Sequence, residues 1–244
     1  MTAISGPYRE RFLSRRRTIE LVRELESHPA DVTATSYISP GSAEIPGWEW
    51  LPPAAMRSPG GLVLVSGPML DLAIGPPYEI KLVEGDTTRD GPSFGPLVSS
   101  LVQRRLIAFI LLRLGAYAVG VADDENLVAS KSGTRYVKGR HRAGGQSQRR
   151  FERNREEWIS KLYDQVCAEV TTRFGPYERE LHALATGGDR HVVEAFMKRC
   201  GFADRLRRRV TTIDVPVERP GLKNLGRAVT RAWGCQAWDK DRPR

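Results

Sequence analysis

The chain has 244 residues, which is long enough for one large domain or two small ones with a buried core. Its formal net charge of +9 favours a polyanionic partner, and nucleic acid more than a membrane surface. Cys167, Cys200 and Cys235 are too few and too scattered for a disulfide framework or a zinc cluster, and their odd number fits a reducing cytoplasm. The N-terminal stretch lacks an apolar run, and the longest such run, 106–112, is too short to span a bilayer. We therefore expect a soluble cytoplasmic protein.

The first hundred residues predict one helix and several short strands. Apolar residues at roughly helical spacing predict a helix over 9–27. Runs of apolar and β-branched residues predict three strands, over 32–38, 62–66 and 78–83. Residues 40–61 hold five prolines together with Trp48 and Trp50, which predicts an irregular connection, and 86–96 read as a polar loop. This region, 1–99, either adds to the sheet that follows or forms a small unit of its own.

From residue 104 onward the pattern predicts a sheet with helices packed on it. Three strands in quick succession, over 104–113, 116–122 and 126–131, predict an antiparallel meander. Apolar residues at steps of three and four predict a long helix over 147–174, which Gly175 and Pro176 end. Two further strands and two further helices follow, over 181–185, 189–200, 210–217 and 221–233. The order favours an α+β (α/β-like) fold with a mixed sheet, in a domain over 100–238.

The most informative stretch, residues 138–155, reads KGRHRAGGQSQRRFERNR. Gly144 and Gly145 permit backbone angles that other residues resist, and Gln146 follows them directly. Between residues 135 and 156, eight Lys or Arg residues stand against two Glu residues, which is dense enough to favour RNA over an ordinary solvated turn. A flexible tip with one amide on a basic stem suits delivery of a small polar group into a site walled by nucleic acid.

This stretch closely resembles the segment around the Gly-Gly-Gln tip in the central domain of eukaryotic and archaeal class I translation release factors. The similarity is greatest to the VLRF family, release-factor-like domains related to the eukaryotic peptidyl-tRNA hydrolase of ribosome quality control, and to its actinobacterial-type bacterial branch. It covers roughly residues 100–235, although only the loop and the early helix are specific. The resemblance implies an RNase H-like, release-factor central-domain fold with an N-terminal elaboration.

The resemblance also implies hydrolysis of the ester that joins a nascent peptide to tRNA. Gln146 would place a water by its backbone N–H or its side-chain amide, while Gly144 and Gly145 let the backbone pass close to RNA. Gln148 competes for this role, because Gly145 to Gln148 fits the Gly-x-x-Gln spacing of many VLRF members; the position of Ser147 after the first glutamine favours Gln146. The residues expected to contact RNA are Lys138, Arg140, His141, Arg142, Ser147, Arg149, Arg150 and Arg153.

Other constellations are weaker. Asp123, Asp124 and Glu125 are expected to form an acidic hairpin turn, with a nuclease-like metal site as the less favoured alternative. The turn at 187–189 fits either phosphate binding or a strand-to-helix connection with an N-cap at Asp189. The cluster at 205–209 fits an RNA contact or a solvated helix end equally well, and the two tryptophans fit a contact surface or a core.

The leading hypothesis is a ribosome-associated peptidyl-tRNA hydrolase that frees nascent chains from stalled, obstructed large subunits. Its partners would be large-subunit rRNA and peptidyl-tRNA, and we expect a monomer that needs no cofactor and no membrane. The alternatives are a non-catalytic RNA- or ribosome-binding protein of the same fold and, less favoured, a metal-dependent nuclease.

Overall fold

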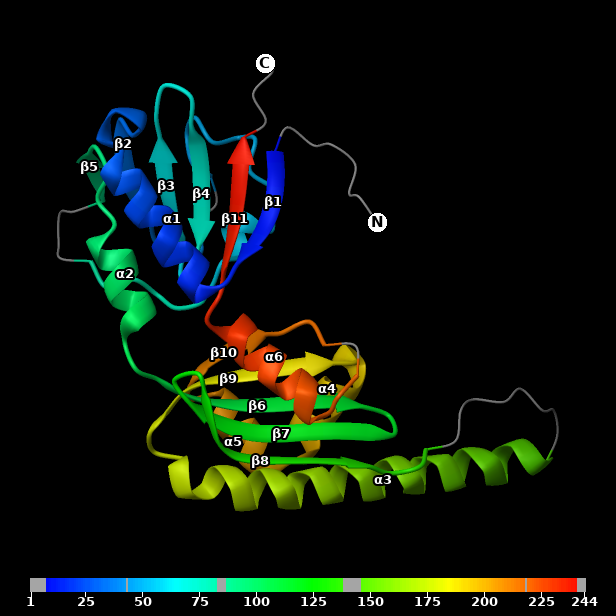
Figure 1. Ribbon diagram of the computed structural model, residues 1–244. Helices are drawn as coiled ribbons and strands as arrows, with labels where there is room; N and C mark the ends of the chain where they lie inside the picture. The colour runs from blue at the N-terminus through cyan, green and yellow to red at the C-terminus, as the bar shows by residue number, and fades with distance from the viewer. Residues whose placement is uncertain (1–7, 43, 83–86, 138–145, 218, 241–244) are drawn as a thin grey trace. The chain divides into compact units, whose positions relative to one another are not determined.

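The computed structural model describes residues 8–42, 44–82, 87–137, 146–217 and 219–240, with the backbone alone described at 146–149 and 151. The chain forms two compact units. The first combines residues 1–103 with 233–244, and the second comprises residues 104–232. Each unit contains its own sheet (Figure 1).

The sheet of the second unit begins with the expected meander. Strands β6 (Leu106–Arg113), β7 (Ala116–Asp123) and β8 (Asn126–Thr134) pair antiparallel in chain order. Strand β9 (Leu181–Gly188) then lies parallel to β6 on its other side, and β10 (Thr211–Asp214) lies parallel to β9. The order β10-β9-β6-β7-β8 is that of an RNase H-like mixed sheet, so the predicted fold class is confirmed.

Helices cover both faces of this sheet because successive residues of a strand point to opposite sides. Even-numbered residues of β6, such as Ala108 and Ile110, share a core cluster with the first three helices of the unit. On the other side, Gly120 of β7 lies so close to Leu225 that an added Cβ would come within 2.9 Å of that side chain. The helices are α3 (Gln146–Phe174), α4 (Arg190–Arg199) and α5 (Gly201–Arg207) on the first face, and α6 (Leu222–Ala232) on the second.

Helix α3 is the longest helix described in the second unit, and its bounds differ from the predicted 147–174 by one residue. Leu162, Val166, Val170 and Phe174 recur every fourth residue and are completely buried. A short 3-10 turn (Gly175–Tyr177) follows the helix, as the Gly-Pro pair predicts.

The first unit is an antiparallel sheet in the order β1-β11-β4-β3-β2-β5. Helices α1 (Arg15–Ser27) and α2 (Gly95–Val102) supply Val22, Leu97 and Leu101 to its main core cluster. Residues of the connection after β2 belong to a second hydrophobic cluster. In this connection Trp48 and Trp50 are half-buried, and the centroids of their rings lie 5.4 Å apart. The strands are β1 (Tyr8–Leu13), β2 (Ala34–Ile38), β3 (Leu62–Ser66), β4 (Asp71–Gly75), β5 (Thr88–Asp90) and β11 (Cys235–Lys240), and the 3-10 turns are Pro29–Asp31 and Ala55–Arg57.

Several expectations for this unit need correction. The predicted helix over 9–27 begins at Arg15, because Ser14 caps it by accepting a hydrogen bond from the Arg17 N–H, and the residues before Ser14 form β1. No strand is present over 78–82, the described part of the strand predicted at 78–83. The segments β1, β4, β5, β11, α2 and α5 were not predicted as such.

The C-terminal strand belongs to the first unit. Strand β11 pairs with β1 and β4, so residues 235–238 lie in the first sheet and not with the region predicted to span 100–238. The five described strands before residue 99, β1 to β5, form a sheet with β11 and not with the strands of the second unit.

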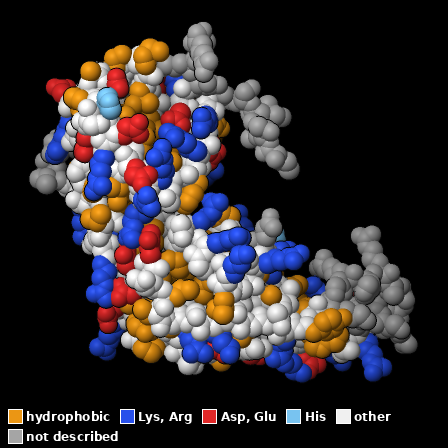
Figure 2. All heavy atoms as spheres, viewed as in Figure 1, with side chains coloured by type: hydrophobic (Ala, Val, Ile, Leu, Met, Phe, Trp, Pro, Cys, Tyr) orange, Lys and Arg blue, Asp and Glu red, His pale blue; other side chains and the backbone are white. Residues whose placement is uncertain are grey.

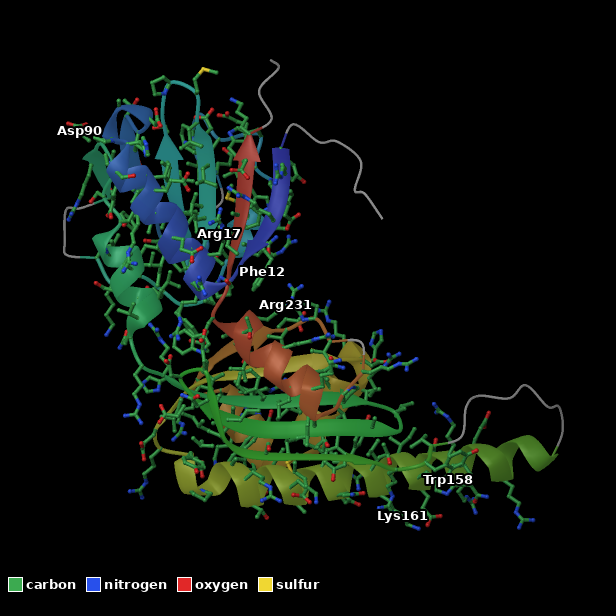
Figure 3. The ribbon with its side chains drawn as sticks, viewed as in Figure 1. Phe12, Arg17, Asp90, Trp158, Lys161 and Arg231 are labelled. Carbon is green, nitrogen blue, oxygen red and sulfur yellow. A yellow bond between two sulfur atoms is a disulfide. The ribbon has the colours of Figure 1, made fainter. Side chains whose placement is uncertain are left out.

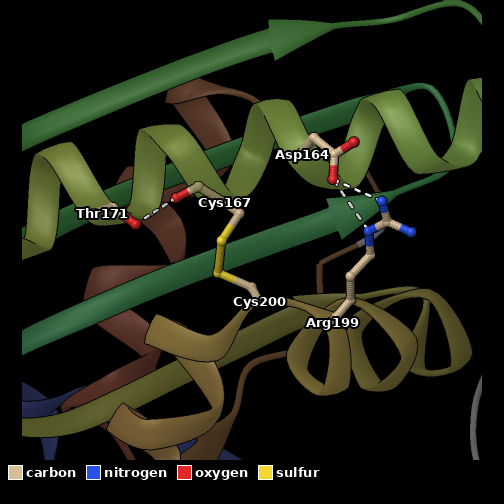
Figure 4. Close-up of a disulfide and its surroundings, with 5 residues drawn as sticks. All are labelled: Asp164, Cys167, Thr171, Arg199 and Cys200. Carbon is tan, nitrogen blue, oxygen red and sulfur yellow. Dashed lines mark hydrogen bonds and ion pairs between the residues drawn. A yellow bond between two sulfur atoms is a disulfide. The ribbon is translucent and has the colours of Figure 1, made fainter.

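The cysteines also differ from expectation. Cys167 of α3 and Cys200, between α4 and α5, form a disulfide (Figure 4). Beside it, the Arg199 guanidinium lies 2.8 Å from an Asp164 carboxylate oxygen. The third cysteine, Cys235, is a buried free thiol, and burial raises its pKa to about 12. The sequence indicated no pairing because the two cysteines are separated by 33 in the sequence and are brought together only by tertiary packing.

Opening this disulfide is expected to lower the free energy of unfolding by about 3–4 kcal/mol, since it closes a loop with a sequence separation of 33. Urea unfolding of the oxidised protein and of the double variant Cys167→Ala/Cys200→Ala measures the difference. Wild-type protein under strong reductant is the control and should unfold at the same midpoint as the variant. Equal midpoints for oxidised and reduced wild type would contradict the prediction.

Candidate catalytic loop

The candidate loop connects β8 to α3. Strand β8 ends at Thr134, residues 135–137 continue from it, and α3 begins at Gln146. Gln146, Ser147, Gln148 and Arg149 thus form the first turn of the helix. The remaining predicted site residues of the loop lie outside the described part of the chain: Lys138, Arg140, His141, Arg142, Gly144 and Gly145.

A chain of hydrogen bonds attaches the entry of the loop to the sheet and the helix. The Arg135 guanidinium donates to the side-chain oxygen of Gln165 on α3 at 3.0 Å, and the Gln165 amide lies 3.2 Å from the Tyr117 hydroxyl on β7. The Arg135 N–H also donates to the carbonyl of Gly115 at 3.0 Å. The backbone therefore leaves the sheet at a defined position.

An aromatic contact reinforces this attachment one residue later. The rings of Tyr136 and Trp158 meet edge to face with centroids 6.0 Å apart, and Trp158 lies on the N-terminal half of α3 (Figure 3). Tyr136 remains 73% exposed, so the pair joins strand exit and helix at the surface. Trp158 is one of the apolar residues whose spacing predicts the helix, but the sequence gives no sign of its contact with Tyr136. The only available signal was an aromatic residue next to a basic glycine loop.

The N-terminal part of α3 extends past the ends of the strands of this sheet, as Figure 1 shows. Accordingly, Arg150 and Arg153 are exposed, whereas the buried face of the helix starts only at Leu162. Glu157 is paired with Lys161, which holds the pKa of that carboxyl below its usual range. The N-terminal part of α3 therefore presents exposed arginines next to the loop, while the C-terminal half of the helix is packed in the core.

The first turn of α3 can donate hydrogen bonds from its backbone. The first four N–H groups of an α-helix have no acceptor within the helix, and they carry the positive end of its dipole. Residues 146–149 occupy these positions. The backbone at the candidate glutamine can therefore donate to a water or to an oxygen that gains negative charge.

The acidic residues at 123–125 lie at the turn between β7 and β8. Asp123 accepts from the Arg104 guanidinium at 2.6 Å, and this hydrogen bond holds the pKa of its carboxyl below the usual range. Asp124 adopts a φ of +57° at the tip of the β7–β8 hairpin. No group of three or more potential metal ligands occurs in the described parts of the chain. The hairpin interpretation is confirmed, and nothing among these residues supports a metal-dependent nuclease.

The turn at 187–189 is a strand-to-helix connection with an N-cap, as one of its two interpretations expects. The Asp189 carboxylate accepts from the N–H groups of His191 and Val192 at 3.0 and 3.2 Å. The arginines after α4 are largely engaged with carboxylates. Arg205 pairs with Glu178, and both Arg207 and Arg208 pair with Asp204. This favours the structural interpretation of that cluster.

An RNase H-like sheet whose meander leads through a basic glycine loop into a long helix defines a domain of release-factor type. The model of the Actinobacteria/chloroflexi VLRF1 release factor family (acVLRF1) matches residues 105–236. This is more than half of the chain, and the protein belongs to that family.

Individual relatives are archaeal release factors. The chain is 33% identical over 101 residues to peptide chain release factor subunit 1 of Archaeoglobus fulgidus, covering 41% of this chain and 25% of that protein. It is 26% identical over 185 residues to the Aeropyrum pernix protein of the same name, covering 71% and 48%. The chain therefore spans about half or less of the length of these relatives.

Solved structures to which the chain shows some similarity include an archaeal translation termination factor, aRF1, and the Vms1 mitochondrial localization core. The first has 18% identity and a TM-score of 0.40, covering 90% of this chain and 70% of that one. The second has 12% identity and a TM-score of 0.45, covering 75% and 77%. Separately, no helix in the described residues has the length and apolar character needed to cross a membrane.

Proposed function

We propose that this protein is a ribosome-associated peptidyl-tRNA hydrolase that releases nascent chains from stalled large ribosomal subunits. The observation that carries the proposal is the position of the Gly-Gly-Gln sequence at the start of a 29-residue helix in a domain of the VLRF1 release factor family. The loop would carry the reacting group and the helix would hold it.

In the proposed reaction, a water oxygen attacks the carbonyl carbon of the ester between peptide and tRNA. The bond from that carbon to the ribose oxygen breaks, the ribose oxygen takes up a proton, and the peptide leaves as a carboxylic acid. Gln146 orients the water through its side-chain amide, and its backbone N–H at the helix start is a second donor. Glutamine does not titrate, so its contribution is positioning.

The basic residues would hold this tip against RNA. Arg150 and Arg153 are exposed on the projecting part of α3, and we assign phosphate contacts to them together with Lys138, Arg140, His141, Arg142, Ser147 and Arg149. The proposed partners are large-subunit rRNA and peptidyl-tRNA, met by a monomer without cofactor. The proposed compartment is the cytoplasm, where reducing conditions would act on the Cys167–Cys200 pair.

The direct test is peptide release from peptidyl-tRNA on isolated large subunits by wild type and by glutamine variants of the loop. A non-catalytic ribosome-binding protein would bind these particles and release nothing.

The Tyr136–Trp158 contact is expected to position the loop for this reaction. Trp158 lies about 18 Å along the helix from Gln146, at 1.5 Å per residue, so it cannot act at the tip directly. Trp158→Ala should slow single-turnover release by about tenfold while leaving subunit binding unchanged, because a displaced reacting group costs rate more than affinity. Tyr136→Phe is the matched control and should release at the wild-type rate, since the ring contact needs no hydroxyl. If Trp158→Ala released peptide at the wild-type rate, this positioning role would be wrong.

A further inference from the structure

Helix α6 carries a basic stripe that the proposed mechanism does not use. Leu225, Val229 and Ala232 are buried against the sheet. On the solvent side, Lys223, Arg227 and Arg231 recur every fourth residue and are exposed. A step of four residues advances about 6 Å along a helix, which is close to the spacing of neighbouring phosphates on an RNA strand. Figure 2 shows Lys and Arg side chains gathered over this helix, and Figure 3 labels Arg231 on it.

The stripe borders a concave site of about 300 Å³ between α6 and the segment that follows β10. Its polar lining comes from Arg219, Asn224, Arg227 and Arg231, and Pro216 and Val217 form part of its apolar wall. No Asp or Glu is among the residues that line it in the described part of the chain. Three arginines thus line one hollow, with no carboxylate in its described lining.

Side-chain contacts organise this site. The Asn224 amide donates to the carbonyl of Arg219 at 2.6 Å, which ties the preceding segment to the helix. The Arg227 guanidinium in turn donates to the Asn224 side-chain oxygen at 3.3 Å. One amide therefore places both the backbone of Arg219 and the guanidinium of Arg227.

These arginines differ from other arginines of the same unit. Arg104, Arg199, Arg205, Arg207 and Arg208 each pair with a carboxylate. Arg219, Lys223 and Arg227 form no such pair with any residue that the structure describes. Arg219, Lys223 and Arg227 carry like charges that no described carboxylate offsets, so an external anion is their natural partner.

We propose that this α6 site binds the phosphodiester backbone of an RNA strand. Guanidinium groups match phosphate oxygens with two parallel hydrogen bonds, and a row of cations at phosphate spacing suits a polymer better than a single ion. The site lies on the opposite face of the sheet from α3, so it would contact an RNA segment other than the one that meets the loop. It does not depend on the hydrolytic activity proposed above.

The test compares full-length wild type with the double variant Arg219→Gln/Arg227→Gln. A matched control, Arg179→Gln/Lys198→Gln, removes the same charge from two exposed residues elsewhere in the second unit. Fluorescence anisotropy with labelled poly(U) RNA gives the dissociation constant at several salt concentrations. Unlabelled polyglutamate and inorganic phosphate, at matched ionic strength, serve as competitors. Peptide release by Gln146→Ala is measured separately, so failure of the hydrolysis proposal can be distinguished from failure of the RNA-binding proposal.

The site variant should bind RNA about tenfold more weakly, with a flatter dependence of affinity on salt, because fewer counterions are released on binding. The control should change affinity less than twofold. Equal affinity and salt slope for wild type and the site variant would overturn the proposal, and so would an equal loss in the control. Displacement of the RNA by polyglutamate would overturn it in favour of an acidic protein partner. Displacement by inorganic phosphate alone would overturn it in favour of a small anion.

Discussion

Replacing Gln146 by alanine is expected to slow peptide release from isolated large subunits by at least about a hundredfold, the usual cost of removing one positioned donor from a site of acyl transfer. Binding to the subunits should persist, because the arginines of the loop and of α3 are unchanged. Single-turnover release with labelled peptidyl-tRNA measures the rate, and co-sedimentation with the subunits measures binding.

Two further variants sharpen this experiment. Gln148→Ala is the matched control, since it removes the same amide two residues away, and it should release at close to the wild-type rate. Gln146→Pro removes the backbone N–H as well, at the first helical position, where proline is well tolerated. A greater loss with proline than with alanine would measure the part played by that N–H.

The outcomes separate the hypotheses. If Gln146→Ala and Gln148→Ala both release peptide at the wild-type rate, the catalytic role of the loop is wrong. If only Gln148→Ala loses peptide release, Gln148 and not Gln146 positions the water. Cleavage of the RNA chain that a chelator abolishes would instead favour a nuclease.

Gly188→Ala is expected to destabilise the second unit by about 3–5 kcal/mol. Gly188 ends β9 with a φ of +109°, a conformation that side chains rarely adopt, and an added Cβ would lie 2.2 Å from the carbonyl oxygen of Leu112. That oxygen belongs to the neighbouring strand β6 and cannot move without disturbing the sheet. Urea unfolding followed by tryptophan fluorescence and circular dichroism measures the loss.

Gly201→Ala is the matched control for this substitution. Gly201 is the first residue of α5, and nothing lies within 4 Å of the position that its Cβ would take. Alanine there should be neutral or stabilise by up to about 1 kcal/mol, because it restricts the unfolded chain. A Gly188→Ala protein that unfolds at the same midpoint as Gly201→Ala would show that the strand end adapts, contrary to this expectation.

Most elements of the second unit could be predicted from local sequence patterns. The meander, the long helix ending at Phe174 and the N-cap at Asp189 each depend on residues close together in the chain. The candidate loop was found in the same way, from a short run of glycines, amides and arginines. What the sequence lacked was any indication of the Tyr136–Trp158 contact or of the Asn224-centred site on α6, because both need elements that only packing brings together.

The sequence by itself determined the fold class of the second unit, the place of the candidate loop and the residue types that the proposed chemistry needs. Only the tertiary structure decided that β11 joins the first sheet, where Tyr8 pairs with Lys240, and that Cys167 meets Cys200. The physical reason is the range of the interactions. Periodicity and capping record what neighbouring residues prefer, whereas strand pairing and disulfide partners depend on which distant segments the folded core brings into contact.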